Sequence, residues 1–241
     1  MKLLSLDMSL SSTGYCLSEV DFDKVGNNLG AKILNLDESE FLGWNILDCG
    51  EIKEEKEVKK LLAKVRKSLK SATEDRGDLL DLEHKYETER IKHQINEITK
   101  IVNNYLGRID YVFIEDYNYH GPGSVTQLAE LRGFLKILLE KLKYSDKIKH
   151  IRYIPIQSIK KIIGMHGHAD KQLIREGLLR FGQEINEKEV DKSDAIAINI
   201  TGFLTLCYMK DLVTMPTLKD KKDTKIAKSY LESLEKITNR I

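Results

Sequence analysis

The chain of 241 residues contains only three cysteines, and they do not occur in pairs. Cys16, Cys49 and Cys207 lie far apart, are odd in number and form no Cys-x-x-Cys motif. The sequence therefore carries no signal for a disulfide framework or a cysteine zinc site. This cysteine usage is typical of a protein that works in a reducing compartment.

Long apolar runs are missing as well. The longest, Ala195 to Met209, is too short to span a bilayer and contains Asn199 and Thr201. Near the N-terminus, Asp7 interrupts the apolar stretch too early for a signal peptide. With 32% charged and 41% hydrophobic residues, the composition predicts a soluble cytoplasmic protein with a real core and no membrane contact.

Charge of one sign is not in excess, but the net charge of +1 hides two opposed segments. Residues 37–57 contain eight acids and two lysines, whereas residues 147–180 contain eight Lys or Arg and two acids. Such runs are often solvated faces and nothing more. The functional alternative is a basic surface that faces a polyanion. Charge alone leaves both interpretations open.

Short apolar runs bounded by turns predict strands at 2–7, 15–20, 108–115 and 148–155. Ser9 to Gly14 reads as the turn of a first hairpin. One more strand is expected within 31–36 or 43–52, and the stretch 25–47 is expected to be an irregular, loop-rich insertion.

Helical periodicity is clearest in two places. Apolar residues from Leu79 to Leu106 predict a long amphipathic helix within the charged stretch 53–106, and residues 191–208 predict a long apolar helix. Further helices are expected after an N-cap at Ser124 and at 158–163, 171–181 and 217–241. This alternation predicts an α/β sandwich with a mixed sheet.

Four carboxylates stand at points where they can converge. Asp7 follows the first apolar strand, Glu115 ends the strand 111–115, and Asp191 and Asp194 lie three residues apart at the head of the apolar helix. Acids at the end of a buried strand are costly unless they are paired or bind a metal. The pattern indicates a divalent-metal site of the kind used in phosphodiester chemistry.

Each of these acids has a simpler explanation when taken alone. Asp191 or Asp194 fits a capping acid in the first turn of a helix, where the helix dipole stabilises negative charge. Glu115 fits an exposed strand-end residue. Asp7 is harder to explain this way because it follows a core strand directly. The conjunction favours the metal site.

Four segments, in order, resemble the motifs of RuvC-type Holliday junction resolvases. These are Leu4–Tyr15, then Ile114-Glu115 with Leu128–Gly133, then Ile159–Lys171, and last Asp191–Ile198. Together they span most of residues 2–206. The chain departs from the family where an aromatic wedge is expected three residues after the glutamate. That position is Asn118, with tyrosines on either side.

The resemblance implies a ribonuclease-H-like fold, with a mixed five-stranded sheet flanked by helices. Residues 1–210 would form the nuclease domain, with a charged insertion at about 21–100 and a Lys-rich helical extension at 211–241. It also implies a homodimer that nicks two strands of a four-way DNA junction and leaves 5′-phosphates. Long, divergent members of this kind are typical of bacteriophages, which would place the protein in the cytoplasm of a bacterial host.

By the same resemblance, Asp7, Glu115, Asp191 and Asp194 would be the catalytic ligands of two Mg²⁺ ions, with Mn²⁺ as a substitute. DNA contacts are expected from lysines that flank the glycine loop 164–167 and from tyrosines beside Glu115, which could stack on unpaired bases. These residues are Lys160, Lys161, Lys171, Tyr117 and Tyr119. Solvation of the lysines, and packing of a tyrosine at the sheet edge, are the alternatives.

Three other functions remain in view. One is a ribonuclease-H-like nuclease that acts on other branched, flapped or packaged DNA. An actin-like ATPase would need a second phosphate loop of Asp-Gly-Gly type, which the sequence lacks. A junction-binding module without activity would be expected to have lost at least one of the four acids, and all four are present.

Overall fold

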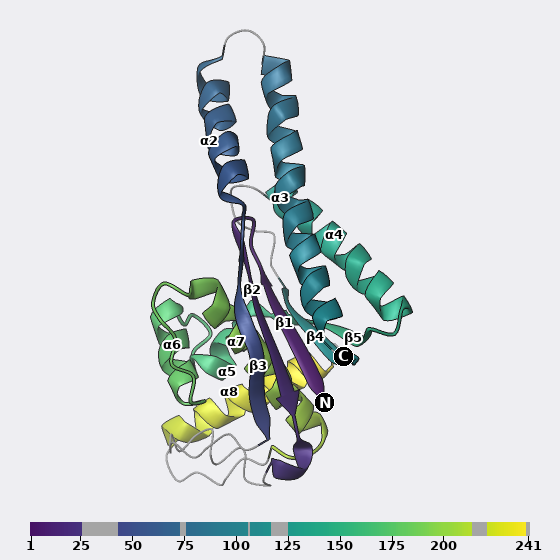
Figure 1. The fold of residues 1–241 in the computed structure, drawn as a ribbon. Coiled ribbons are helices and arrows are strands. Elements are labelled where there is room, and N and C mark those ends of the chain that lie inside the picture. The colour runs from purple at the N-terminus through teal and green to yellow at the C-terminus, as the bar shows by residue number, and fades with distance from the viewer. Residues whose placement is uncertain (26–42, 73–75, 106, 117–124, 214–220, 240–241) are drawn as a thin grey trace.

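The computed structural model describes residues 1–25, 43–72, 76–105, 107–116, 125–213 and 221–239. In this part of the chain, five strands form one sheet in the order β3-β2-β1-β4-β5 (Figure 1). They are β1 (Lys2–Met8), β2 (Ser12–Val20), β3 (Trp44–Lys53), β4 (Ile109–Asp116) and β5 (Ile148–Pro155). Strands β1, β2 and β3 pair antiparallel, while β1, β4 and β5 pair parallel. The predicted mixed five-stranded sheet is confirmed.

Two strand boundaries differ from the prediction. Strand β2 begins at Ser12 because Thr13 and Gly14 already pair with Met8 and Asp7, so the turn is shorter than expected. The third strand lies in the later of the two predicted windows. The prediction of irregular structure was wrong for residues 44–47, which belong to β3. Trp44 explains the difference, since its buried ring anchors the start of β3. The earlier window, 31–36, lies outside the described residues.

Helices α3 (Arg76–Asn104) and α4 (Val125–Tyr144) cover one face of the sheet (Figure 1). Ile91, Ile98 and Val102 of α3 join Leu131, Leu135 and Leu139 of α4 in a core with the strands. This core confirms the long amphipathic helix. The N-cap expected at Ser124 and the helix-end residue Leu106 lie outside the described residues.

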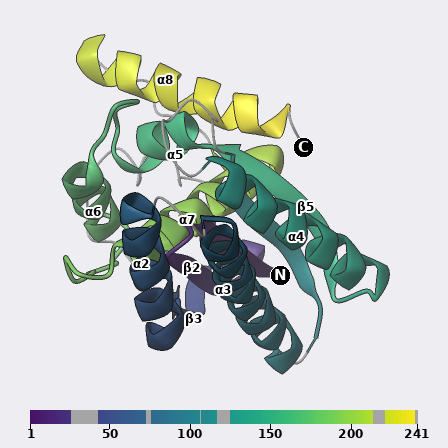
Figure 2. The same cartoon turned by 90° about the horizontal axis from the view of Figure 1, so that it is seen from above.

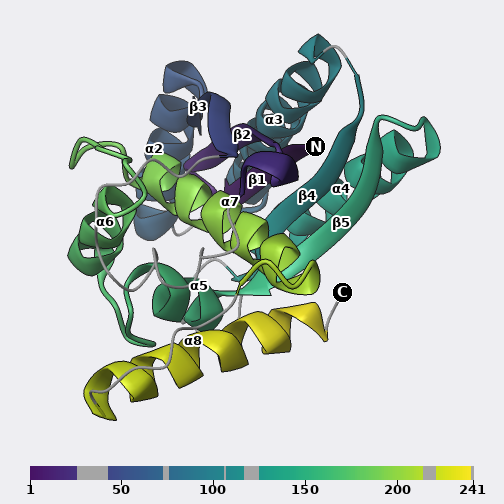
Figure 3. The same cartoon turned by 90° about the horizontal axis from the view of Figure 1, so that it is seen from below.

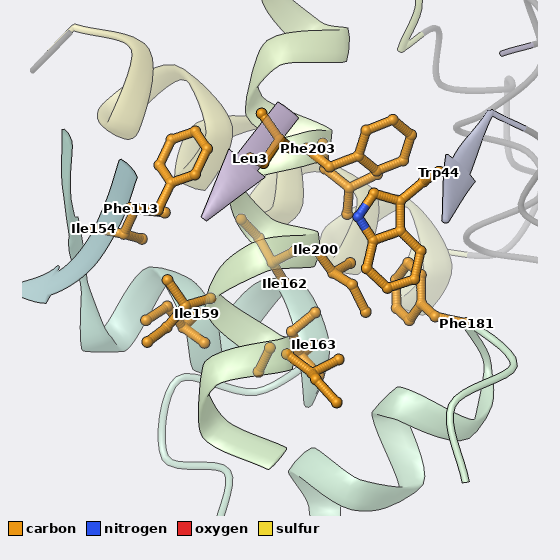
Figure 4. Close-up of a cluster of buried hydrophobic side chains, with 14 of the residues drawn as sticks. Leu3, Trp44, Phe113, Ile154, Ile159, Ile162, Ile163, Phe181, Ile200 and Phe203 are labelled. Atoms are coloured by element: carbon orange, nitrogen blue, oxygen red, sulfur yellow. The ribbon is translucent and has the colours of Figure 1, made fainter. Parts of the chain in front are cut away.

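The other face carries α7 (Val190–Met209), flanked by α5 (Ile156–Ile163), α6 (Lys171–Leu179) and α8 (Lys221–Thr238). Their apolar side chains surround Phe113 and Phe203 in a second core (Figure 4). Helix α8 packs alongside α5 and α7, and its Tyr230, Leu234 and Ile237 are buried (Figure 3). The helix expected in 217–241 is therefore present, while a domain division near residue 210 stays a prediction.

Helix α2 (Lys56–Ser71) was not anticipated as a separate element. It packs against α3 through Val58, Leu62 and Val65, and the two helices rise as a hairpin beyond the sheet (Figure 1). A short 3₁₀ turn, η1 (Phe22–Lys24), follows β2. Its apolar residues Val58, Leu62, Val65 and Leu69 recur at helical spacing, so this helix was open to prediction from the sequence.

Helix α7 packs close to the strand backbone, and a group of buried hydrogen bonds holds it there. The Asn199 carboxamide oxygen accepts hydrogen bonds from Ser18 Oγ at 2.6 Å and Trp44 Nε1 at 2.9 Å. Its Nδ2 donates to the Cys16 carbonyl at 2.9 Å. These bonds satisfy a fully buried amide, so they specify one seating of α7 on β2 and β3.

Two glycines, Gly14 of β2 and Gly202 of α7, allow α7 to lie close to the sheet. Gly14 pairs with Asp7 across the β1–β2 ladder, and a Cβ on Gly14 would lie 1.9 Å from the carbonyl oxygen of Asp191. A Cβ on Gly202 would meet the Phe113 ring at 2.4 Å. The first turn of α7 therefore rests directly on the strand beside Asp7.

We predict that Gly14→Ala destabilises the fold by at least about 1–3 kcal/mol, because the added methyl group overlaps the α7 backbone. Thermal unfolding followed by circular dichroism measures the change. Gly133→Ala is the matched control, since nothing lies within 4 Å of its Cβ position in α4. There, alanine should stabilise the helix by roughly 0.5–1 kcal/mol. A Gly14→Ala protein as stable as the parent would contradict the close seating.

Candidate active site

The four predicted carboxylates line one cavity of about 430 Å³. Asp7 and Glu115 each follow a residue of the Leu6–Ile114 pair, so the parallel register of β1 and β4 brings them to the same edge of the sheet. Asp191 and Asp194 enter from the first turns of α7. The sequence placed these acids at strand ends and on a helix face, and the structure brings all four together.

Burial and mutual repulsion dominate the electrostatics of this cavity. The side chains of Asp7 and Glu115 are only 4% and 6% exposed. Burial, then the neighbouring acids Glu115, Asp194 and Asp191, hold the pKa of Asp7 well above its usual range. Burial raises the pKa of Glu115 to about 7 and that of Asp194 to about 6.

Two buried oxygens of this pair lack a partner. Asp7 Oδ1 and Glu115 Oε1 make no hydrogen bond with any of the described residues. The ionised pair then needs a cation.

Carboxylate oxygens are the ligands that Mg²⁺ prefers, so the donor set and the two orphaned oxygens fit a divalent ion. Within the described ranges, no group of three or more His, Cys, Asp or Glu side chains forms a finished metal site. A bound cation would replace the repulsion among the acids with attraction.

Basic side chains border the acids on the α5 and α6 side. Lys160 and Lys171 line the cavity, and Lys171 has the largest effect in lowering the pKa of Asp194 after burial has raised it. Lys160 lowers the pKa of both Glu115 and Asp194. Lys161 is not in the cavity lining, and its aliphatic stem lies beside Gly167. Tyr117 and Tyr119 lie outside the described residues.

Several residues of the site were not singled out by sequence. Asp170 lines the cavity and caps α6, where its side chain accepts from Leu173 N at 2.9 Å. Arg132 of α4 donates to the Glu115 carbonyl at 3.0 Å and lowers the pKa of that acid. Asp170 lies beside Lys171 in the third RuvC-like segment, Ile159–Lys171, so the sequence could have identified it as a site residue. No local signal links Arg132 to a strand that precedes its own helix.

Gln94 of α3 fixes the turn that follows Asp7. Its Nε2 donates to the carbonyls of Ser9 at 3.2 Å and Leu10 at 2.9 Å. Its Oε1 accepts from Thr13 Oγ1 at 2.8 Å. Since Gln94 is only 1% exposed and Ser9 lines the cavity, one buried amide ties α3 to the rim of the site.

Comparison with known proteins identifies the family of this chain. The family model described as crossover junction endodeoxyribonuclease RuvC matches residues 58–202, which is more than half of the chain. The chain belongs to the RuvC family. The matched segment includes Glu115, Asp191 and Asp194 but begins after Asp7, so the place of Asp7 in the cluster follows from the sheet register.

Two solved structures share the RuvC fold with this chain. The Thermus thermophilus RuvC structure matches with a TM-score of 0.50 at 12% identity, covering 83% of this chain and 91% of that one. T. thermophilus RuvC in complex with Holliday junction substrate matches with a TM-score of 0.53 at 14% identity, covering 90% and 99%. A search of curated proteins gave no match.

No helix in the described residues of this RuvC family member has the length and apolar character needed to cross a bilayer.

We predict that the metal-free protein loses stability as the pH rises. The folded-state pKa values of Glu115 and Asp194, about 7 and about 6, exceed the ordinary values of 4.5 and 3.8. The folded chain therefore keeps protons that the unfolded chain has lost, and the free energy of unfolding falls from about pH 4 to about pH 7.

Thermal unfolding in EDTA across this range tests the point, with Glu115→Gln as the comparison. The variant should show a flatter pH dependence, and Mg²⁺ should restore the parent most above pH 7. Equal slopes for parent and variant would contradict the role given to Glu115.

We predict that Gln94→Leu costs about 1–3 kcal/mol, because a shape-conserving change leaves the Ser9 and Leu10 carbonyls and the Thr13 hydroxyl without this partner. Urea unfolding gives the value. Gln172→Leu on the exposed surface of α6 is the control and should fall within about 0.5 kcal/mol of the parent. Equal losses for the two variants would remove the special role of Gln94.

Proposed function

We propose that the protein is a structure-selective DNA endonuclease that resolves four-way junctions by paired, Mg²⁺-dependent nicks and leaves 5′-phosphates. One observation carries the proposal. Four acids from two adjacent strands and one helix converge in a single cavity of a RuvC family member. The neighbour solved with a Holliday junction substrate supports the choice of DNA.

Asp7, Glu115, Asp191 and Asp194 would hold the divalent ions, with Mg²⁺ as the natural metal and Mn²⁺ as a substitute. Bound ions of this kind activate water and stabilise the oxygen that leaves phosphorus. The rigid pairing of β1 with β4 keeps the two buried acids at a fixed spacing. The hydrogen bond from Arg132 to the Glu115 carbonyl holds the end of β4 in place.

Lys160 and Lys171 would draw the DNA backbone to the acids. Both line the cavity, and both lower the pKa of Asp194, so their charges act across the site. A DNA phosphate that enters the cavity would contact the positively charged side chains of these lysines. Lys161, Tyr117 and Tyr119 remain proposed DNA contacts. The tyrosines would stack on bases that are unpaired at the crossover.

Paired nicks require two catalytic centres. Each chain supplies one set of four converging acids in its described part. We therefore propose that two copies act together as a homodimer, one on each cut strand. The three cysteines of each chain are free thiols, as is usual for proteins of the cytoplasm.

Cleavage of a synthetic mobile four-way junction in Mg²⁺ tests the proposal. The parent protein should cut two opposed strands, whereas Asp7→Asn should cut at least about a hundredfold more slowly because one buried ligand is lost. Asp81→Asn, an exposed acid on α3, is the matched control and should cut like the parent. Full cutting by Asp7→Asn would remove the metal assignment.

Y-shaped, flapped and linear substrates of the same sequence decide the substrate class. Preference for the four-way junction with paired nicks supports a resolvase. Preference for Y-shaped or flapped DNA would favour the alternative, a ribonuclease-H-like nuclease for other branched DNA. Junction binding without cutting would leave only a binding module.

A further inference from the structure

Helix α2 carries a concentration of positive charge that the catalytic cavity does not use. It contains seven Lys or Arg residues and one acid, Glu57. Arg66 is neutralised by Glu83 at 2.7 Å and by Glu87, and Lys59 pairs with Glu54 at 3.1 Å. The remaining charges therefore need a separate explanation.

Four of the remaining lysines form one line, which we call the lysine strip: Lys56, Lys60, Lys64 and Lys67. Steps of four, four and three residues keep them on one side of the helix, opposite the packed side chains Val58, Leu62 and Val65. All four are exposed, and within the described residues none makes an ion pair. At 1.5 Å per residue, the strip is about 16 Å long.

The strip begins close to the catalytic edge of the sheet. The Glu54 amide donates to the Ser11 carbonyl at 3.1 Å, so α2 starts beside the turn that follows Asp7. Seen from above, α2 stands on the α6 and α7 side of the hairpin and α3 on the α4 side (Figure 2). Of the two hairpin helices, α2 therefore lies nearer to α6, the helix that begins at Lys171 (Figure 2).

The base of the hairpin is built to hold α2 in a fixed direction. Arg90, which is 6% exposed, pairs with Glu87 and lies 3.6 Å from Glu54, while Arg66 of α2 reaches Glu87 from the other side. Buried, mutually bonded charges of this kind specify geometry more than they add stability. The lysine strip is therefore a rigid surface and not a loose basic tail.

We propose that the lysine strip binds the phosphate backbone of a duplex DNA arm that leaves the catalytic cavity. This inference rests on the proposed function and extends it to a second contact surface. The whole of α2 spans about 24 Å, or roughly seven base pairs along an arm. Because the contacts are to phosphates, the strip reads no sequence and adds affinity and orientation.

Duplex DNA fits the strip better than a membrane or an acidic protein does. A membrane-bound helix needs a free apolar face, but the apolar face of α2 is packed against α3 and only Leu61 is exposed among its large apolar residues. An acidic protein partner would need no particular relation to the cavity. The strip instead starts at the edge where DNA must enter.

The test compares Lys60→Gln/Lys64→Gln/Lys67→Gln with Lys85→Gln/Lys92→Gln/Lys100→Gln. The control removes the same charge from exposed lysines of α3. Binding of a labelled four-way junction and of a linear duplex is measured by fluorescence anisotropy in EDTA over a salt series. Circular dichroism checks that both variants keep the parent's helix content and thermal midpoint.

The strip variant should bind both DNAs roughly tenfold more weakly at moderate salt, with a salt slope reduced by about three, whereas the control should match the parent. Hydroxyl-radical footprints of the junction should lose protection on an arm beyond the crossover. Unchanged affinity and slope, or an equal loss in the control, would overturn the proposal.

Two further outcomes separate this inference from the proposed function. If the parent binds DNA through the strip but cuts no junction, the strip stands and the proposed function fails. Binding to vesicles of phosphatidylcholine and phosphatidylserine tests whether the strip binds an anionic membrane instead of DNA. Strip-dependent binding to vesicles without strip-dependent binding to DNA would overturn the assignment to DNA.

Discussion

The low seating of α7 on the sheet is the constraint on which the rest of the structure depends. Helix α7 can approach β2 this closely only because position 14 has no side chain, and the buried Asn199 amide then locks the helix at one height. The same contact brings the first turns of the helix beside Asp7. The packing of α7 therefore also assembles the site, because a helix farther from the sheet would move Asp191 and Asp194 away from the other two acids.

The acids themselves work against the fold. Burial and proximity raise the pKa of Asp7, Glu115 and Asp194 because separated charges have been brought together in a poorly solvated cavity. The surrounding cores and the β1–β4 pairing must hold this arrangement in the absence of metal. Such stored repulsion is the physical basis for cation affinity, since a bound ion converts an unfavourable cluster into a favourable one.

The helical hairpin connects to the site through α3. Gln94 holds the turn after Asp7, while the upper part of the same helix supports α2 and its lysines. The helix that supports α2 therefore also contacts the turn beside the acids.

Local sequence predicted much of this protein, because several features depend on neighbours in the chain. Apolar runs ending in acids gave the strands and the positions of Asp7 and Glu115, and the spacing of Asp191 and Asp194 gave a shared helix face. Helix α2 was missed although Val58, Leu62, Val65 and Leu69 recur at helical spacing, because the prediction treated the whole charged stretch 53–106 as one weakly periodic segment.

By itself, the sequence determined which residue types were available: four acids at element ends, lysines around a glycine loop, and a fold of alternating strands and helices. Only the tertiary structure decided which of them meet. It placed Lys160 and Lys171 in the cavity but not Lys161, and it brought Arg132 to the end of the preceding strand and Gln94 to residues 81 or more positions away in the chain. The reason is physical, since such contacts depend on strand register and on the height of one helix, and no local pattern encodes either.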